Sequence, residues 1–334
     1  MLFQNFVTLL VVFLLIASLL RASKSPLWLE AIRRLKRKRL AVAALSVICA
    51  YGLVAALDSI GWTDRTSQRP TTVIDLLFKK PLEATYSAPL AKMTTAEAHP
   101  RKLISPQGHL FGTNGVGEDV LYRALKGCRT ALIIGGLTSL VAVPIAILLG
   151  LAAGYFGKLT DDAVQYTYTV FASVPDILLL IALILVLGKG LPQICLALAV
   201  TSWVPLCRLV RGETLKHRDR EYVRAARALG AGNTRILTRH ILPNLMPVVL
   251  ISTVLGFSSF ILYEAILSYL GVGVGEDVGS WGNMIDSART ELSRDPVIWW
   301  NLTAATLAMF GLVLALNVFG DALRDAIDPR LRTR

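Results

Sequence analysis

The sequence predicts an all-α protein, a polytopic bundle of transmembrane helices with a six-helix core and one additional helix at the N-terminus. Two observations support this fold class. Of the 334 residues, 54% are hydrophobic and only 17% are charged, whereas a soluble domain carries roughly a quarter charged residues. The apolar residues also form runs close to the roughly 20 residues that cross hydrocarbon as a helix, in which every backbone group is satisfied internally.

The first apolar run, residues 6–20, has no Lys or Arg before it and has Arg21 and Lys24 after it. A cleaved signal peptide shows the opposite order of charge. We therefore expect an uncleaved helix with its N-terminus outside, the alternative being a helix that lies in the membrane interface. The six core spans are expected at 40–57, 129–153, 163–187, 191–210, 244–263 and 297–319, which leaves the C-terminus in the cytoplasm.

Polar stretches separate these spans. The longest is expected to form an extracytoplasmic loop or small cap, ending in a short amphipathic helix at 116–127 that lies along the outer interface. The expected divisions of the chain are the N-terminal helix with a basic cytoplasmic linker (1–39), the first core helix (40–57), the extracytoplasmic part (58–127), the core transmembrane domain (128–320) with a cytoplasmic segment (212–243), and the cytoplasmic tail (321–334).

The net charge of +12 follows this expected topology. Residues 21–39 hold eight Lys or Arg against a single acid, Glu30, and 208–240 hold nine against three acids. By contrast, 271–296 hold five acids and two Arg. Short basic loops stay in the cytoplasm. The charge therefore records orientation in the membrane and gives no reason to expect a nucleic-acid partner.

The sequence contains no catalytic constellation. It has no G-x-x-x-x-G-K-[ST] phosphate loop, so ATP binding by that means is not expected, and it has no H-E-x-x-H motif. Its four cysteines form no C-x-x-C pair and are expected to be small buried apolar side chains: Cys49, Cys128, Cys195 and Cys207. We expect no catalytic residue, no metal site and no cofactor bound by this chain.

One soluble-looking stretch, "EYVRAARALGAGNTRILTRHILPN" at 221–244, interrupts the apolar spans. Gly230 is expected to end its first helix, and a second short helix to end against Pro243, in the first turn of the next span. The small face of the first helix suits docking in a groove of another protein. The alternative is an interfacial helix held by anionic headgroups. The face is expected to consist of residues at helical spacing, namely Tyr222, Ala225, Ala226 and Leu229.

The stretches "RAARALG" (224–230) and "HILPN" (240–244) resemble the E-A-A-x-x-x-G…L-P signature of permease subunits of binding-protein-dependent ABC importers. The resemblance covers about residues 105 to 330, with every block in the family's order. Further blocks are similar to the dipeptide/oligopeptide/nickel permease group, namely "FGTNGVGEDVLYRALKGCRTAL" (111–132), "EAILSYLGVGV" (264–274), "WGNMI" (281–285) and "ALNVFGDALRDAIDPR" (315–330).

This resemblance implies that 221–230 is a coupling helix, which fits into a cleft of an ATP-hydrolysing subunit. Its partners would be a second homologous permease subunit, two cytoplasmic ATPase subunits that use ATP and Mg, an extracytoplasmic solute-binding protein and the lipid of the bacterial inner membrane. The implied mechanism is alternating access driven from the coupling helix. The docking residues carried over are Glu221, Tyr222, Arg224, Ala225, Ala226, Leu229, Gly230 and Pro243.

Three features depart from the family's pattern. Arg224 stands where the family has Glu, and the helix at 6–20 is additional to the usual six. Asn114 and Glu118 stand where the family's outer motif has Asp and Arg, so different contacts are expected at the outer face. Dipeptides, longer peptides, nickel complexes and small sugars all stay open as substrates.

Two carboxylates lie within the expected spans. Asp176 follows Pro175 near the middle of the expected span 163–187, and Glu264 lies near the outer end of the expected span 244–263. Because a charge at membrane depth is costly, both are candidate pathway or gating residues. Alternatively, Asp176 caps the half-helix that restarts after Pro175, and Glu264 pairs with an outer-loop Arg or with the second permease. As ion-coupling carboxylates they would make the chain a secondary transporter, the runner-up function.

Overall fold

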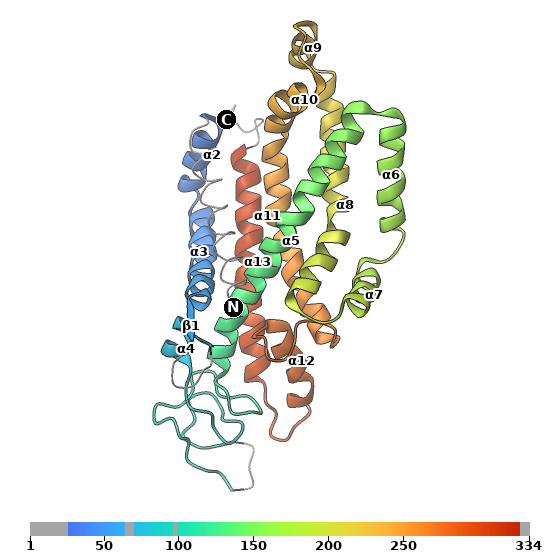
Figure 1. Ribbon diagram of the computed structural model, residues 1–334. Helices are drawn as coiled ribbons and strands as arrows, with labels where there is room; N and C mark the ends of the chain where they lie inside the picture. The colour runs from blue at the N-terminus through green and yellow to red at the C-terminus, as the bar shows by residue number, and fades with distance from the viewer. Residues whose placement is uncertain (1–25, 64–69, 96–98, 328–334) are drawn as a thin grey trace.

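The structure is a computed structural model that describes residues 26–63, 70–95 and 99–327. The expected hydrophobic helix at 6–20 and the end of the C-terminal tail lie outside the described residues. The described chain is an elongated bundle of helices (Figure 1) with one two-stranded antiparallel sheet. The all-α fold class is therefore confirmed.

Five of the six core spans expected from the sequence are present as continuous helices. Five helices are long and apolar enough to cross a membrane. The remaining expected span, 163–187, falls on a pair of apolar helices, α6 (Lys158–Ala172) and α7 (Asp176–Leu187), that meet at a bend of 86°. The five continuous helices are α3 (Arg39–Ser59), α5 (Val120–Phe156), α8 (Leu191–Arg218), α11 (Leu242–Tyr269) and α13 (Trp300–Ile327).

The break between α6 and α7 follows from the local sequence. Pro175 has no backbone N–H and disfavours the α conformation for the residue before it, Val174. The α6 helix therefore ends at Ala172, and α7 begins at Asp176. In Figure 1, α6 and α7 form one edge of the bundle, and α7 turns aside from the axis of α6.

Helices α5 and α8 pack closely at the centre of the bundle because α5 carries glycine at the contact. A Cβ atom at Gly150 would lie 2.8 Å from the carbonyl oxygen of Cys207. One at Gly154 would lie 2.8 Å from the carbonyl oxygen of Arg211. Small residues let transmembrane helices approach to backbone contact. These two helices therefore form a tight central pair.

The expectation of a separate amphipathic helix at 116–127 is wrong. Helix α5 begins at Val120 and continues without interruption for 37 residues. The side chain of Asp119 caps it by accepting the backbone N–H of Tyr122 at 3.2 Å. The apolar face of its first turns packs on Trp281. The indole N–H of Trp281 donates to the Ala124 carbonyl at 2.8 Å. The apolar face is therefore buried against other parts of the protein and does not lie in the membrane interface.

The remaining elements lie at the two ends of the bundle (Figure 1). We name the two ends by the topology expected from the sequence. At the outer end, residues between α3 and α5 form a small cap that includes a hairpin and one short helix. At the cytoplasmic end lie an amphipathic helix and the segment between α8 and α11. The outer elements are β1 (Gly61–Thr63), β2 (Pro70–Thr72), α4 (Val73–Phe78) and α12 (Trp281–Glu291), and the cytoplasmic ones are α2 (Pro26–Arg37), α9 (Glu221–Ala228), α10 (Asn233–Arg235) and the π-helix η1 (Ile236–Ile241).

Candidate functional site

The cytoplasmic segment forms a short helix that projects from the bundle. Helix α9 lies beyond the ends of the long helices, at the cytoplasmic end of the molecule (Figure 1). One side of α9 packs on the bundle through Val223, which is fully buried, and Ala226, which is 8% exposed. Both join an apolar cluster with Ile236, Ile241 and other residues of the flanking helices. This cluster fixes how α9 is oriented.

The opposite side of α9 is open to solvent. Leu229 is 88% exposed and Tyr222 is 37% exposed, and Ala225 also lies on the surface. These three residues, at i, i+3 and i+7, share one helix face. Of the four-residue stripe expected from the sequence, three therefore point outward. Ala226 points inward instead, because Val223 fixes the buried side of the helix and Ala226 follows it at i+3.

Gly230 ends the helix as expected. Its φ angle is +81°, a conformation that favours glycine. The N–H of Ala231 donates to the Ala226 carbonyl at 3.0 Å, and the N–H of Gly230 donates to the Arg227 carbonyl at 3.0 Å. These two bonds are the pattern of a Schellman motif. The chain therefore reverses sharply after α9.

Polar contacts join the segment to α5. The hydroxyl of Tyr155, near the cytoplasmic end of α5, donates to the side-chain oxygen of Asn233 at 2.9 Å. The Arg227 guanidinium lies 5.8 Å from the centre of the Tyr155 ring and donates to its hydroxyl at 3.4 Å. With the buried Val223, these contacts bind α9 to the bundle as one unit. A force on α9 would act on α5 directly.

The second short helix expected before Pro243 is replaced by a continuous one. Residues from Asn233 run through α10 and η1 into α11, and Pro243 lies in its first turn, as expected. The N–H of Leu242 donates to the Leu237 carbonyl, five residues back, which is the π-helical register. The helix therefore passes through Pro243, and the expectation that a separate helix ends against this proline is wrong.

A crevice of about 690 Å³ opens inside the membrane-spanning part. Asp176 lies on its wall and is exposed within this single chain. The hydroxyl of Tyr263 on α11 donates to the Asp176 carboxylate at 3.3 Å. The crevice is formed by residues of α5, α6, α7, α8 and α11, which also include Ser139, Phe171, Thr201, Ser202, Arg208, Ser252, Thr253, Ser259 and Phe260.

Glu264 lies elsewhere, in the protein interior. It is 2% exposed and accepts hydrogen bonds from the hydroxyls of Ser268 at 2.8 Å and Ser280 at 2.5 Å. Ser280 is also the N-cap of α12, where it accepts the N–H of Gly282. Glu264 therefore joins α11 to the start of α12. It does not line the crevice that contains Asp176.

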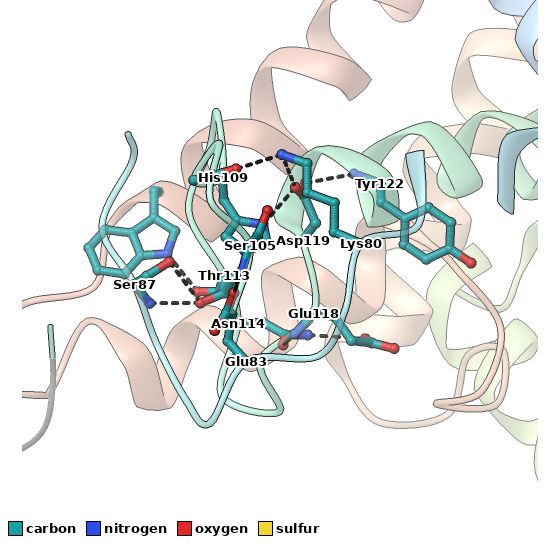
Figure 2. A network of polar contacts seen from close by, with 12 residues as sticks. Lys80, Glu83, Ser87, Ser105, His109, Thr113, Asn114, Glu118, Asp119 and Tyr122 are labelled. Atoms are coloured by element: carbon teal, nitrogen blue, oxygen red, sulfur yellow. Dashed lines mark hydrogen bonds and ion pairs between the residues drawn. The ribbon is translucent and has the colours of Figure 1, made fainter. Parts of the chain in front are cut away.

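The outer cap contains a buried ionic network that the sequence did not reveal (Figure 2). The imidazole of His109, with no exposed surface, lies between two carboxylates. Its Nδ1 is 2.8 Å from Asp119 and its Nε2 is 3.3 Å from Glu83. Lys80 lies 3.4 Å from the same oxygen of Asp119. The N-cap of α5 is thereby fixed to loops of the cap.

Both carboxyl groups of this network favour the ionised form. Burial alone would raise the pKa of Glu83, but backbone N–H donors of Ile104 and Ser105, together with His109, hold this pKa below its ordinary value. Burial likewise opposes ionisation of Asp119, yet hydrogen bonds from His109 and the Tyr122 N–H lower its pKa. The two carboxylates are therefore fixed as charged groups within the cap, with the Lys80 ammonium group beside Asp119.

The altered outer motif has its own ion pair. Glu118, which stands where the resembling family has Arg, accepts from the Arg123 guanidinium at 2.6 Å. The Asn114 amide group donates to Glu118 at 3.3 Å, and the Asn114 carbonyl oxygen accepts the N–H groups of Val116 and Glu118. These contacts hold Asn114 and Glu118 against one another and against the start of α5.

Comparisons with known proteins agree on the class. A family described as "Binding-protein-dependent transport system inner membrane component" matches residues 146–333. The oligopeptide transport system permease protein OppC of Bacillus subtilis is 32% identical over 310 residues, covering 92% of this chain and 90% of that protein. The dipeptide permease DppC of Alkalihalophilus pseudofirmus is 30% identical over 308 residues, covering 92% and 91%.

A solved structure was also found. A chain of the MetNI methionine ABC transporter in an inward-facing conformation is 20% identical and has a TM-score of 0.48, covering 63% of this chain and 96% of that one. The family match and the two relatives span the bundle and the cytoplasmic segment together. The chain therefore belongs to the family of inner membrane components of binding-protein-dependent transport systems, as a multi-pass permease subunit without an ATP-hydrolysing site of its own.

Proposed function

We propose that this chain is the transmembrane permease subunit of an ABC importer that carries peptides or a similar small solute. It works with a second homologous permease subunit, two ATPase subunits that use ATP and Mg, and an extracytoplasmic solute-binding protein. The peptide substrate rests on relatives named as oligopeptide and dipeptide permeases. Family membership favours this function over ion-coupled secondary transport.

The open face of α9 is the observation that carries the docking part of this proposal. Tyr222, Ala225 and Leu229 form an exposed face with a large apolar side chain at one end. Glu221 and Arg224 lie beside it on the surface and supply charge of both signs. A cleft of an ATPase subunit would cover the apolar face and bind the charged residues at its rim, as in other interfaces between proteins. Ala226, Gly230 and Pro243 act by shaping the segment.

The contacts of α9 support its role in transmission. Closure of the ATPase pair would displace α9, and the contacts of Tyr155 with Asn233 and Arg227 pass that displacement to α5. Because α5 and α8 touch at backbone distance, they would move as one body. Such a rigid-body change is the usual basis of alternating access.

The crevice supports a pathway role for Asp176. Its wall combines hydroxyl groups, aromatic rings and one carboxylate, which suits a polar solute passing through hydrocarbon. Glu264 would affect gating only through the junction of α11 with α12, since its hydrogen bonds are made there. We therefore assign Asp176 to the pathway and Glu264 to the support of its outer end.

The docking proposal is tested by co-purification of the chain with the ATPase subunits encoded nearby. Leu229→Asp places a charge on the exposed face without filling the core, so the permease should fold and lose at least about tenfold of its ATPase binding. The matched control is Leu159→Asp, at an 84% exposed leucine in the first turn of α6. Equal ATPase recovery with both variants would refute docking at α9.

A further inference from the structure

The crevice has opposite electrostatic character at its two ends. Helix α11 runs from the cytoplasm outward, and Tyr263, beside Asp176, is the last of its residues on the crevice wall. Helix α8 runs the other way, and Arg208 lies near its last wall residue. The rise of 1.5 Å per residue places Arg208 about 10 Å closer to the cytoplasm than Thr201. The carboxylate therefore lies at the outer end and the guanidinium at the inner end.

The carboxyl group of Asp176 lies at the outer end of the crevice without a partner of opposite charge in the described part of the chain. Among the described residues it forms no ion pair, and the Tyr263 hydroxyl is its one hydrogen-bond donor from a side chain. Asp176 is the first residue of α7, and the partial positive charge of the helix N-terminus offsets only part of a carboxylate charge. A carboxylate at this depth is retained at a cost, which a cationic ligand would relieve.

Aromatic rings accompany this carboxylate. Phe171, Phe260 and Tyr263 all contribute to the crevice wall. The face of an aromatic ring attracts an ammonium group, and a carboxylate beside such rings is the usual chemistry for binding a protonated amine. Arg208 does not compete at this end, because its guanidinium stacks 4.6 Å from the centre of the Tyr168 ring on α6.

We propose that Asp176 and Tyr263 form a recognition site for the protonated amine of the transported solute, so that this permease selects solutes with a free ammonium group, such as unblocked peptides. The ammonium group pairs with the Asp176 carboxylate and donates to the Tyr263 hydroxyl oxygen. The volume of about 690 Å³ is that of a small-molecule site. The peptide groups of the solute form hydrogen bonds with the hydroxyls of Ser259, Thr253 and Thr201 on the crevice wall. This inference rests on the proposed function.

The test uses the complete transporter in proteoliposomes, with its solute-binding protein at saturation. Uptake of trialanine is compared with uptake of N-acetyl-trialanine, which lacks the ammonium group. The wild type should prefer free trialanine. Asp176→Asn should lower the uptake of trialanine at least about tenfold and leave that of the acetylated peptide unchanged, so that the preference disappears. Asp176→Glu should restore it, and Tyr263→Phe should reduce it by a smaller factor.

Two controls separate this inference from the function on which it rests. Asp162→Asn, at an exposed carboxylate near the cytoplasmic start of α6, should leave the preference intact. ATP hydrolysis stimulated by the binding protein is measured in each variant and should persist in Asp176→Asn. An unchanged preference in Asp176→Asn, with transport intact, overturns the amine site and leaves the importer standing. A wild-type complex that transports neither peptide and hydrolyses no ATP overturns the proposed function and the site together.

Discussion

The outer cap and the cytoplasmic segment differ in what they bury: the cap buries charged side chains, and the segment leaves apolar side chains exposed. In the cap, His109, Glu83 and Asp119 are buried and bind one another or backbone groups of the same chain. In the cytoplasmic segment, Leu229 and Tyr222 lie exposed on a helix that the chain leaves uncovered on one side. The charged side chains of the network in the cap find their partners within the chain. The segment instead leaves Leu229 and Tyr222 uncovered, on the face where we propose that an ATPase subunit binds.

The two regions differ in how firmly their helices are held by the rest of the chain. The cap fixes the start of α5 by a capped N-terminus and a network of opposite charges. The segment fixes only the buried side of α9, through Val223 and Ala226. Removing one carboxylate of the network should therefore lower the free energy needed to open the cap. Changes on the outer face of α9 should harm assembly and spare the fold.

The largest effect is expected for Asp119→Ala. This change removes the cap of α5 and leaves His109 and Lys80 without their shared carboxylate, a loss that costs about 3 kcal/mol or more in other buried ion pairs. Hydrogen exchange of the Tyr122 and Ser105 amides measures the free energy of opening. Glu276→Ala, at an exposed acid of the outer loop, is the control and should have no effect. Equal protection in both variants would mean that the network does not hold the cap.

Acid should open the cap as well. Glu83 and Asp119 have pKa values below their ordinary ones, so their stabilisation is present above the pKa of the unfolded chain, near about 4. It is lost as the pH falls through the still lower pKa of the folded state. Protection of the Ile104 amide should therefore decline when the pH is lowered below about 4. Glu83→Gln should weaken this dependence, and a dependence that persists unchanged would exclude Glu83 as its source.

A smaller effect is expected at the end of α9. Gly230→Ala should cost about 1 kcal/mol, because the residue has a positive φ, while a Cβ there would meet no atom within 4 Å. Gly232→Ala is a matched control, since Gly232 has the same open surroundings and an ordinary φ of −68°. Exchange rates of the α9 amides should rise in the first variant alone. Equal rates in the two would show that the backbone conformation at Gly230 is not what ends α9.

The smallest effect is expected for the ion pair of the altered outer motif. Glu118 and Arg123 are both partly exposed, so solvent screens their attraction. Arg123→Gln should lower the stability of the cap by less than about 1 kcal/mol. Thermal unfolding in detergent at low and high salt checks this value. A loss as large as that of Asp119→Ala would place the pair among the main supports of the cap.

The membrane spans could be predicted because the length of an apolar run determines them. An apolar run long enough to cross hydrocarbon must become a helix, and Pro175 marked the one span that breaks. The ends of the helices were less accessible. Nothing in the residues 116–127 separates a surface helix from the first turns of α5. The difference depends on Trp281, more than 150 positions away in the sequence, which covers that face.

The buried and exposed sides of α9 likewise depend on contacts that its own sequence does not reveal. Helical spacing correctly grouped Tyr222, Ala225 and Leu229 on one face, yet it added Ala226, because small residues are compatible with either side. The inner side was decided by Val223 and its contacts with η1 and α11. The network around His109 gave little signal, since of its members only Asp119, the partner of His109, lies in a block, 111–132, that resembles the family. Its members come from irregular loops, in which no period connects Glu83 to its partners.

The length of α5 has a mechanical consequence. Its 37 residues extend about 55 Å, from the cap that holds Asp119 to the contacts of Tyr155 with the cytoplasmic segment. Such a rod acts as a lever, in which a tilt of one degree moves the far end by about 1 Å. Pro144 removes one internal hydrogen bond along it and gives the lever a single point of compliance. A small rotation at the ATPase side would thus become a displacement of several ångströms where the solute enters.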